Sequence, residues 1–287
     1  MKICRFRENS GAEIRIGLVT DDAAIQDLTP AGVTTLQAIL EQEDPVSYLE
    51  GLIKTLSPAR VSLGRVTLCA PVEGQEVWAA GVTYLRSKKA RMEESDFSAS
   101  AYDRVYEAAR PEIFFKSIAE KVVPTGDPVG IRRDARWNVP EPELALVINS
   151  RGRVVGYTIG NDMSSRDIEG ENLLYLPQAK VYHRSCALGP WIALGAKEEE
   201  VRQWKIQIEI QRAGQKVFGG ETLISQLKRR FDELAGYLFR SQEFSRGAIL
   251  LTGTGVVPDE SFTLQADDDV RIEITGIGQL QNRVTIV

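Results

Sequence analysis

Short hydrophobic runs separated by polar turns dominate the chain from residue 112 onward. The runs are rich in Val, Ile and Leu and too short for typical helices, which favours β-strands. The pattern predicts strands at 112–117, 141–149, 153–162, 190–195, 204–212, 248–252 and 270–275. Short strands in irregular order with few helices indicate an α+β fold rather than a doubly wound sheet.

Hydrophobic residues that recur every three or four positions mark the clearest predicted helix, at 221–240. The spacing is typical of a helix that covers a core with one face. Its apolar stripe consists of Ile224, Leu227, Phe231, Leu234 and Leu238. Two modest helices are predicted at 34–41 and 46–56, and the polar segment 88–109 is interpreted as helical or mobile.

The first part of the chain differs in pattern from the rest. Residues 1–70 alternate short apolar runs with Asp and Gly turns, which predicts a small N-terminal α/β module. Turn chemistry at Ala70-Pro71-Val72 marks the end of this module. Residues 71–287 would then form a second, larger domain.

Composition and charge exclude several classes of partner. The 287 residues are 43% hydrophobic and 26% charged, which is ordinary for a soluble protein. A net charge of −5 and a pI near 5.3 argue against a nucleic-acid or anionic-membrane partner, although Arg86, Lys88, Lys89 and Arg91 form a local basic patch. No apolar run is long enough to cross a bilayer, and the N-terminus lacks the apolar core of a signal peptide.

Three widely spaced cysteines, Cys4, Cys69 and Cys186, form neither a paired framework nor a Cys-x-x-Cys motif. Structural zinc and a secreted disulfide scaffold are therefore disfavoured, and a cytoplasmic location is expected. Cys186 and the single histidine, His183, could form a nucleophile and its base. A lone cysteine near a lone histidine is, however, more often a packing residue.

Candidate chemistry begins with two glutamates at the start of a predicted strand. Glu141 and Glu143 lie two positions apart, so their side chains would project from the same face. Asp162 follows 19 residues after Glu143, beyond a turn and a second apolar run, which is the spacing of a hairpin. Three adjacent carboxylates repel one another unless a cation neutralises them, and oxygen-only ligation suits Mg²⁺, Mn²⁺ or Ca²⁺. The alternative is a solvated strand edge and a turn aspartate.

Several motifs, in this order, resemble those of the fumarylacetoacetate hydrolase family over roughly residues 70–287. The motifs are Gly81-Val82-Thr83-Tyr84, Pro111-Glu112-Ile113-Phe114-Phe115-Lys116, Glu141-Pro142-Glu143-Leu144, Asn161-Asp162-Met163-Ser164-Ser165-Arg166-Asp167, Lys180, Gly189-Pro190, Thr252-Gly253-Thr254-Gly255 and Gly276-Ile277-Gly278. The resemblance implies a rolled, mixed β-structure with a metal site at one mouth. It also implies one Mg²⁺ (or Mn²⁺ or Ca²⁺) per chain and a homodimer.

The resemblance supports roles for two further residues beside the metal. Lys180 is the candidate base, because a lysine beside a divalent cation loses its proton more easily. The alternative is a structural ion pair. Glu112, which precedes two aromatic residues, is the candidate acid that protonates a departing hydroxyl. The alternative for Glu112 is an exposed strand-edge residue paired with Lys116.

Further candidates would contact a 2-oxo acid substrate: Thr254, Tyr84, Arg86, Lys88, Gln178 and Tyr182. Thr254 could hold a carboxylate or only close its turn. Arg86 and Lys88 could reach a hydroxyl or carboxylate of the substrate, although surface charge is the default interpretation. Gln178 and Tyr182 would share a face with Lys180 if this segment were a strand.

One departure from the family's pattern separates its branches. The hydrolases of the family carry a histidine shortly after the Gly-x-Asn-Tyr motif to activate water, and none follows Tyr84 here. The sequence therefore resembles the sugar-acid dehydratase branch. It predicts a metal-dependent dehydratase of a 2-keto-3-deoxy sugar acid, a pentonate that would give 2,5-dioxopentanoate. Alternatives are a C–C hydrolase, a 2-oxo acid decarboxylase, an isomerase, or a non-catalytic protein that binds sugar acids.

Overall fold

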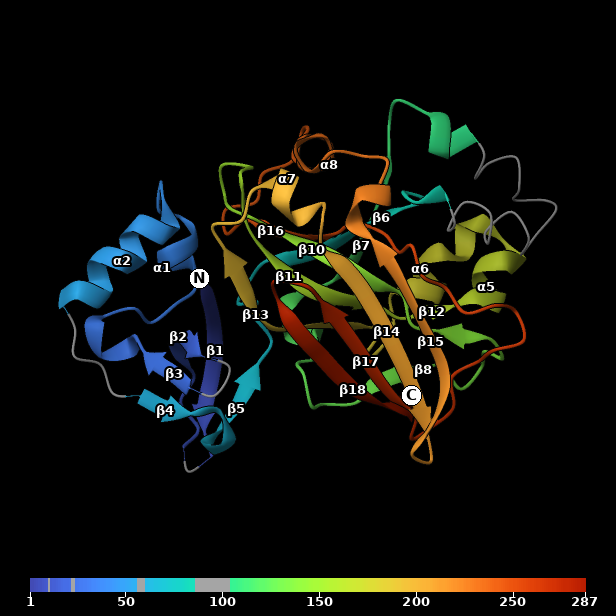
Figure 1. The fold of residues 1–287 in the computed structure, drawn as a ribbon. Coiled ribbons are helices and arrows are strands. Elements are labelled where there is room, and N and C mark those ends of the chain that lie inside the picture. The colour runs from blue at the N-terminus through green and yellow to red at the C-terminus, as the bar shows by residue number, and fades with distance from the viewer. Residues whose placement is uncertain (10, 22–23, 56–59, 86–103) are drawn as a thin grey trace.

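A mixed sheet of 11 strands runs through the molecule, and a second sheet of five strands packs against its middle (Figure 1). The computed structural model describes residues 1–9, 11–21, 24–55, 60–85 and 104–287. Across the large sheet the strands are β4 (Arg60–Ser62), β3 (Ala24–Asp27), β2 (Arg15–Asp21), β1 (Lys2–Glu8), β13 (Cys186–Leu194), β11 (Val154–Asp162), β10 (Pro142–Ile148), β16 (Ala248–Leu251), β6 (Glu76–Gly81) and β7 (Glu112–Ser117). Strand β5 (Val66–Cys69) pairs with β1.

The five-stranded sheet lies in front of these central strands in Figure 1. Its order is β15 (Gln215–Leu223), β14 (Lys205–Arg212), β17 (Asp269–Ile274), β18 (Gly278–Ile286) and β8 (Val129–Ile131). A two-stranded sheet pairs β12 (Ser164–Ser165) with β9 (Asn138–Val139). The α+β class predicted from the sequence is confirmed.

Helices are short and lie around the sheets. Those that lie wholly within the described residues are α1 (Gln37–Leu40), α2 (Pro45–Thr55), α5 (Arg166–Glu171), α6 (Leu176–Lys180), α7 (Glu198–Val201) and α8 (Phe231–Leu238). Single 3₁₀ turns are η1 (Thr29–Ala31), η2 (Leu63–Arg65), η3 (Ala119–Lys121), η4 (Leu173–Tyr175) and η5 (Ile224–Gln226). No helix among the described residues is long and apolar enough to cross a membrane.

Strand β10 is buried on both faces, because it lies between two hydrophobic cores. Leu144 and Leu146 point into the core between the two sheets, which also contains Ile206 of β14. Ala145 and Val147 point into the opposite core, beneath α1 and α2. A strand covered on both faces has a continuous apolar run rather than alternation, as the sequence shows here.

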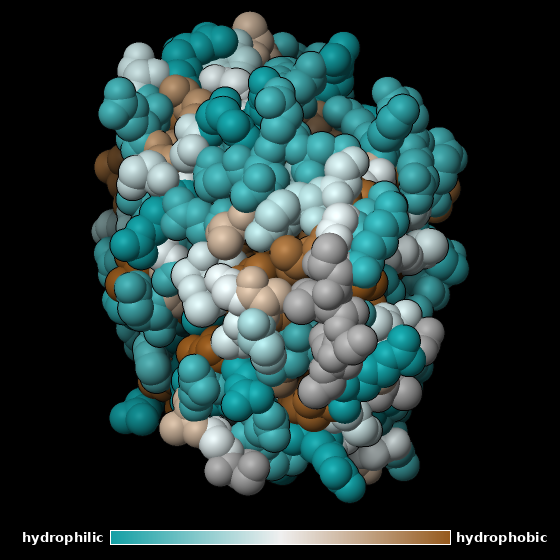
Figure 2. All heavy atoms as spheres, turned by 90° about the vertical axis from the view of Figure 1, so that its left-hand side faces the viewer, coloured by the Kyte–Doolittle hydropathy of each residue, from teal (hydrophilic) through white to brown (hydrophobic). Residues whose placement is uncertain are grey.

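The N-terminal strands continue the main sheet. Strand β1 pairs with β13 in antiparallel register, with Ile3 opposite Ile192. The outer face of this region, seen in Figure 2, is mostly hydrophilic, with hydrophobic side chains exposed mainly near its middle.

The expected boundary near residue 70 falls between β5 and β6. A division into domains 1–70 and 71–287 stays a prediction.

All seven predicted strands are present to within a few residues, as are the helices predicted at 34–41 and 46–56. The helix predicted at 221–240 is largely wrong. Strand β15 continues to Leu223, η5 follows, and only Phe231–Leu238 is helical. Ile224 and Leu227 are nevertheless buried, because the 3₁₀ turn and a bridge from Leu227 to Tyr84 direct them to the core. The apolar spacing thus arose from three different elements. From residue 112 onward, strands β8, β9, β12, β15 and β18 were not predicted.

Candidate metal centre and catalytic pocket

The hairpin of β10 and β11 brings the three predicted carboxylates together. Glu141 and Glu143 flank the first residue of β10, and Asp162 ends β11, where its backbone N–H donates to the carbonyl of Glu141 at 3.0 Å. Pro142 fits the first position of the strand, where its missing N–H breaks no ladder bond. One carboxylate oxygen from each of Glu141, Glu143 and Asp162 lies within 4.8 Å of the other two, and all three residues are buried.

Two of these carboxylates are surrounded by cationic side chains. Lys180 Nζ lies 2.8 Å from Glu141 Oε2 and 3.1 Å from Asp162 Oδ2. Arg166 Nη2 donates to the second oxygen of Glu141 at 2.8 Å, and Lys116 Nζ lies 2.5 Å from Asp162 Oδ1. Lys116, Arg166 and Lys180 are themselves almost fully buried. Buried charges of one sign are thus matched by buried charges of the other, as their desolvation requires.

Glu143 has a different environment. The backbone N–H of Gly253 donates to Glu143 Oε2 at 2.6 Å, and no ion pair to Glu143 forms within the described part of the chain. Burial, followed by the charges of Asp162 and Glu141, raises the pKa of Glu143 well above its ordinary value. A divalent cation among the three carboxylates would offset this cost. The buried, oxygen-only donor set therefore fits Mg²⁺, Mn²⁺ or Ca²⁺.

The three carboxylates open onto a small pocket. It is lined by Ala80, Gly81, Val82, Glu112, Phe114, Glu141, Glu143, Asp162, Glu169, Lys180, Gly253 and Thr254. These residues come from β6, β7, β10, β11, α5, α6 and the loop after β16. Segments distant in sequence therefore meet where the central strands end.

Glu112, the candidate acid, begins β7 opposite Gly81 of β6. Its carboxylate lies so close to Gly81 that a Cβ on this glycine would be 2.0 Å from Glu112 Oε2. Glycine at position 81 therefore leaves room for the acid at the pocket wall. The ion pair of Lys116 is with Asp162, which argues against the alternative in which Lys116 pairs with Glu112.

Lys180 is the last residue of helix α6, and the segment is not a strand. Gln178 and Tyr182 consequently do not share its face. Gln178 is exposed, and its carbonyl accepts from Arg132 Nη1 at 3.0 Å. The Tyr182 hydroxyl donates to the carbonyl of Gly130 at 3.2 Å. Neither side chain lines the carboxylate pocket, because the helical turn directs only Lys180 toward it.

Two more candidates lie beside Glu143. Thr254 lines the pocket, and its hydroxyl donates to the carbonyl of Val256 at 3.0 Å, so it also closes its turn. Tyr84 is buried against Gly255, and burial together with the charge of Glu143 raises the pKa of its phenol. Arg86 and Lys88 lie outside the described residues.

Three residues that the structure places at the site were not predicted from the sequence. Arg166 and Lys116 lie within recognised motifs but had no predicted role at the metal. Glu169 on α5 is buried, lines the pocket, and accepts from Ser164 Oγ at 3.1 Å. A signal existed for Lys116, since positions 112 and 116 share a face on a strand. For Glu169, no pattern in the sequence distinguishes it from a surface acid.

His183 and Cys186 do not form a nucleophilic pair in the pocket. His183 is exposed and lines a separate hollow with Phe115, Lys121 and Tyr182. Cys186 is buried, and burial raises the pKa of its thiol to about 12. A thiol this far from ionisation is not a nucleophile at neutral pH.

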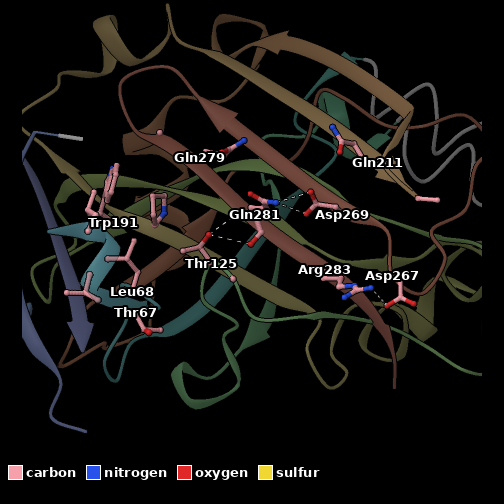
Figure 3. A pocket seen from close by; sticks show the side chains of 17 residues that line it. Thr67, Leu68, Thr125, Trp191, Gln211, Asp267, Asp269, Gln279, Gln281 and Arg283 are labelled. Carbon is pink, nitrogen blue, oxygen red and sulfur yellow. Dashed lines mark hydrogen bonds and ion pairs between the residues drawn. The ribbon is translucent and has the colours of Figure 1, made fainter. Parts of the chain in front are cut away.

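A groove of about 1030 Å³ lies elsewhere, between the N-terminal strands and the five-stranded sheet. Figure 3 shows Leu68 and Trp191 on one side of it and Gln281 and Asp269 on the other. Gln281 Nε2 donates to both carboxylate oxygens of Asp269 at 2.9 Å. These two polar side chains are paired with one another, and the described lining offers no chemistry comparable to that of the carboxylate pocket.

Comparison with known proteins agrees with this geometry. Residues 76–285 match the fumarylacetoacetate (FAA) hydrolase C-terminal family model. A probable 2-keto-3-deoxyxylonate dehydratase of Haloferax volcanii is 48% identical over 217 residues, covering 76% of this chain and 74% of that protein. The 2-dehydro-3-deoxy-D-arabinonate dehydratase of Saccharolobus solfataricus is 38% identical over 218 residues, with coverage of 75% and 73%.

A solved structure extends the similarity to the whole chain. A 2-keto-3-deoxy-D-arabinonate dehydratase complexed with magnesium and 2,5-dioxopentanoate superimposes with a TM-score of 0.84 and 31% identity. The match covers 100% of this chain and 99% of the other. The fold is therefore shared over its full length, N-terminal strands included.

Proposed function

Because the chain belongs to the fumarylacetoacetate hydrolase family, we propose that its carboxylate pocket dehydrates a 2-keto-3-deoxy pentonate to 2,5-dioxopentanoate. The observation that carries the proposal is the meeting of Lys180, Glu112 and three buried carboxylates in one small pocket. Two relatives, 48% and 38% identical, are named dehydratases of acids in this class.

The residues of the pocket have separate tasks. Glu141, Glu143 and Asp162 would hold a divalent cation, with Mg²⁺ supported by the related complex. When bound, such a cation stabilises negative charge that develops on the keto oxygen of a 2-oxo acid. Lys180 can act as a base only in its neutral form. That form becomes more favourable once the charges of Glu141 and Asp162 are balanced by a cation other than the lysine.

Lys180 and Glu112 would then complete a closed proton cycle. Lys180 Nζ takes a proton from C3, while the Glu112 carboxylic acid protonates the C4 hydroxyl, which leaves as water. A double bond forms between C3 and C4. Glu112, now a carboxylate, takes a proton from C5, and Lys180 returns its proton to C3. The resulting enol at C4 and C5 tautomerises to the aldehyde, and both residues are restored.

Substrate stereochemistry is simpler than the names of the relatives suggest. With a ketone at C2 and a methylene at C3, a 2-keto-3-deoxy pentonate keeps one stereocentre, at C4. Derivatives of xylonate and arabinonate with the same C4 configuration are therefore one compound. The enzyme has only two pentonate enantiomers to distinguish.

Hydrolysis is the main competing reaction, since other members of the family carry it out. It requires an activated water aimed at a carbonyl carbon. His183 is the one histidine of the sequence, and it lies outside the carboxylate pocket. Dehydration instead needs only a base and an acid, and Lys180 and Glu112 are both at the pocket wall.

The test is incubation of the purified protein with Mg²⁺ and a panel of 2-oxo acids. The panel contains both C4 enantiomers of 2-keto-3-deoxy pentonate, an acylpyruvate and oxaloacetate. We expect 2,5-dioxopentanoate from one pentonate enantiomer, and pyruvate or CO₂ from the other acids no faster than in the same mixture without protein. Cleavage of the acylpyruvate with both pentonates untouched would contradict the proposal. Pentonate binding without turnover would indicate a sugar-acid binding protein.

We further propose a cytoplasmic homodimer, as the family resemblance and the cysteine pattern predict. The three cysteines are free, which agrees with a reducing compartment. Light scattering of the purified protein measures its mass, and a monomer at micromolar concentration would contradict the dimer.

A further inference from the structure

Lys116 makes three polar contacts behind the carboxylate pocket. Its side chain has no exposed surface, and its ammonium lies 2.5 Å from Asp162 Oδ1. The same ammonium donates to the carbonyl of Met163 at 3.0 Å and to the carbonyl of Lys180. The two carbonyl contacts are hydrogen bonds, and the contact with Asp162 Oδ1 is an ion pair between two buried charges.

The three groups that Lys116 contacts belong to the segments that carry the reacting groups. Asp162 and Met163 form the end of β11 and the residue after it, and Lys180 is the last residue of α6. Helix α6 has five residues, too few to be stable without tertiary contacts. Lys116 on β7 therefore holds a proposed metal ligand and the carrier of the proposed base in one arrangement.

Lys116 acts from behind the pocket. It does not line the carboxylate pocket, although Phe114 and Glu112 of the same strand do. Its neighbours on the far side, Phe115, Lys121, Tyr182 and His183, surround a hollow of about 150 Å³. The lysine thus reaches Asp162 and the Lys180 carbonyl without occupying space that a substrate would need.

We propose that Lys116 is a positioning residue, which orients the Asp162 carboxylate toward the metal centre and fixes helix α6 so that Lys180 Nζ reaches the substrate. The inference rests on the proposed function for the reaction, and on the contacts above for the positioning. Asp162 uses Oδ1 for Lys116 and Oδ2 for Lys180, so its rotation is determined by two cations. Removing Lys116 frees that rotation and takes a donor from two buried carbonyl groups, of which that of Lys180 still accepts from Ser185 Oγ at 2.9 Å.

The direct test compares Lys116→Met with the wild type and with Lys121→Met. Lys121 is exposed, five residues further along, and serves as the matched control. For Lys116→Met we expect kcat to fall by at least about 100-fold with KM within about threefold, because misplaced reacting groups cost turnover more than binding. We expect the Kd for Mg²⁺, measured by calorimetry without substrate, to rise by about tenfold or more, as is usual when a residue supporting a metal ligand is lost. Lys121→Met should match the wild type in all three.

A second variant separates positioning from a merely structural role. Lys116→Ala leaves space next to the hollow behind the pocket, through which butylammonium could enter. We expect added butylammonium to raise kcat of Lys116→Ala by at least about tenfold, because it restores a donor at the same place. If Lys116→Met does not fold, Lys116→Ala prepared with butylammonium supplies the same readouts.

If Lys116→Met folds and both its kcat and its Mg²⁺ affinity stay within about threefold of the wild type, the inference is overturned. Misplaced reacting groups would lower kcat by more than about threefold. A kcat loss that butylammonium leaves unchanged would also overturn it. The Mg²⁺ titration needs no turnover. If the wild type makes no dioxopentanoate while Lys116→Met still binds Mg²⁺ more weakly, the proposed function fails and the positioning role stands.

Discussion

Glu143 is the residue on which the metal assignment depends most directly, because its carboxylate has a backbone donor in place of an ion pair within the described residues. Glu143→Gln retains an acceptor for the Gly253 N–H and removes the charge whose burial raises the pKa of this group. Without metal, we expect the free energy of unfolding to rise by about 1 kcal/mol, since charge repulsion is relieved. We expect Mg²⁺ binding and turnover to be lost.

Urea unfolding in the presence of a chelator measures the stability change, and calorimetry measures Mg²⁺ binding. Glu221→Gln, on exposed β15, is the matched control and should change neither. Mg²⁺ affinity equal to that of the wild type in Glu143→Gln would remove this residue from the metal site.

Gly253 supplies the donor to Glu143 from a backbone conformation that favours glycine, with φ of +92°. A Cβ at this position would lie 2.0 Å from Thr83 Oγ1 and 3.0 Å from the carbonyl of Ala80. Gly253→Ala is expected to lose about 2 to 3 kcal/mol of stability and most of its activity.

Gly214 is the control for this change. It has a φ of +78° in the turn after β14, and no atom lies within 4 Å of the place that an added Cβ would take. Gly214→Ala should cost about 1 kcal/mol and leave kcat unchanged. Thermal unfolding and steady-state kinetics check both variants, and equal effects of the two would mean that contact with Thr83 is unimportant.

The reactivity of the Cys186 thiol is expected to depend on pH, which allows a test of whether this residue takes part in the reaction. Burial raises the pKa of its thiol to about 12, so the reactive thiolate is rare at neutral pH and grows as the pH rises toward that value. We expect iodoacetamide at about pH 8 to leave Cys186 unmodified in the folded enzyme, with full activity. Peptide mass spectrometry locates any label. Loss of activity in proportion to the labelling of Cys186 would instead support Cys186 as a nucleophile.

At the scale of elements, α6 decides which of its side chains take part in the reaction. Lys180→Met is expected to lower kcat by about 10³-fold or more, because the proposed base is lost. Gln178→Ala, on the exposed side of the same helix, should stay within about threefold of the wild type. Steady-state kinetics with the pentonate substrate measures both. Equal losses in the two variants would show that the helix, and not the Lys180 amine, is what the reaction needs.

The same helix shows where sequence reasoning succeeds and where it stops. The convergence of Glu141, Glu143 and Asp162 was predictable, because strand alternation and a hairpin depend only on local spacing. The positions of Gln178 and Tyr182 were not, because a short segment around Pro177 carries too little periodicity to distinguish helix from strand. The role of Lys116 required knowing which segments lie behind β7, which is a long-range property.

Element boundaries near residue 224 show a related limit. Ile224, Leu227 and Phe231 satisfy a helical period although they belong to a 3₁₀ turn, a bridge and helix α8. Burial of Ile224 and Leu227 against a common core produced the spacing. A hydrophobic period therefore identifies residues that face the core more reliably than it identifies the element that carries them.

At the scale of the whole molecule, the burial of β10 on both faces determines which substitutions this strand tolerates. Substitutions in a strand with one solvent-facing side are tolerated at every second position. The side chains of residues 144–148 point alternately into two cores, so substitutions on either face of the strand reduce stability. A library of all single substitutions, selected for turnover, should show unbroken intolerance from Leu144 to Ile148. Strand β14, buried at every second residue, should show a period of two. A period of two in both would mean that the second core is dispensable. The packing of residues 144–148 in two cores also fixes the register of β10. The positions of the glutamates at the start of the strand are therefore constrained during evolution partly by their hydrophobic neighbours.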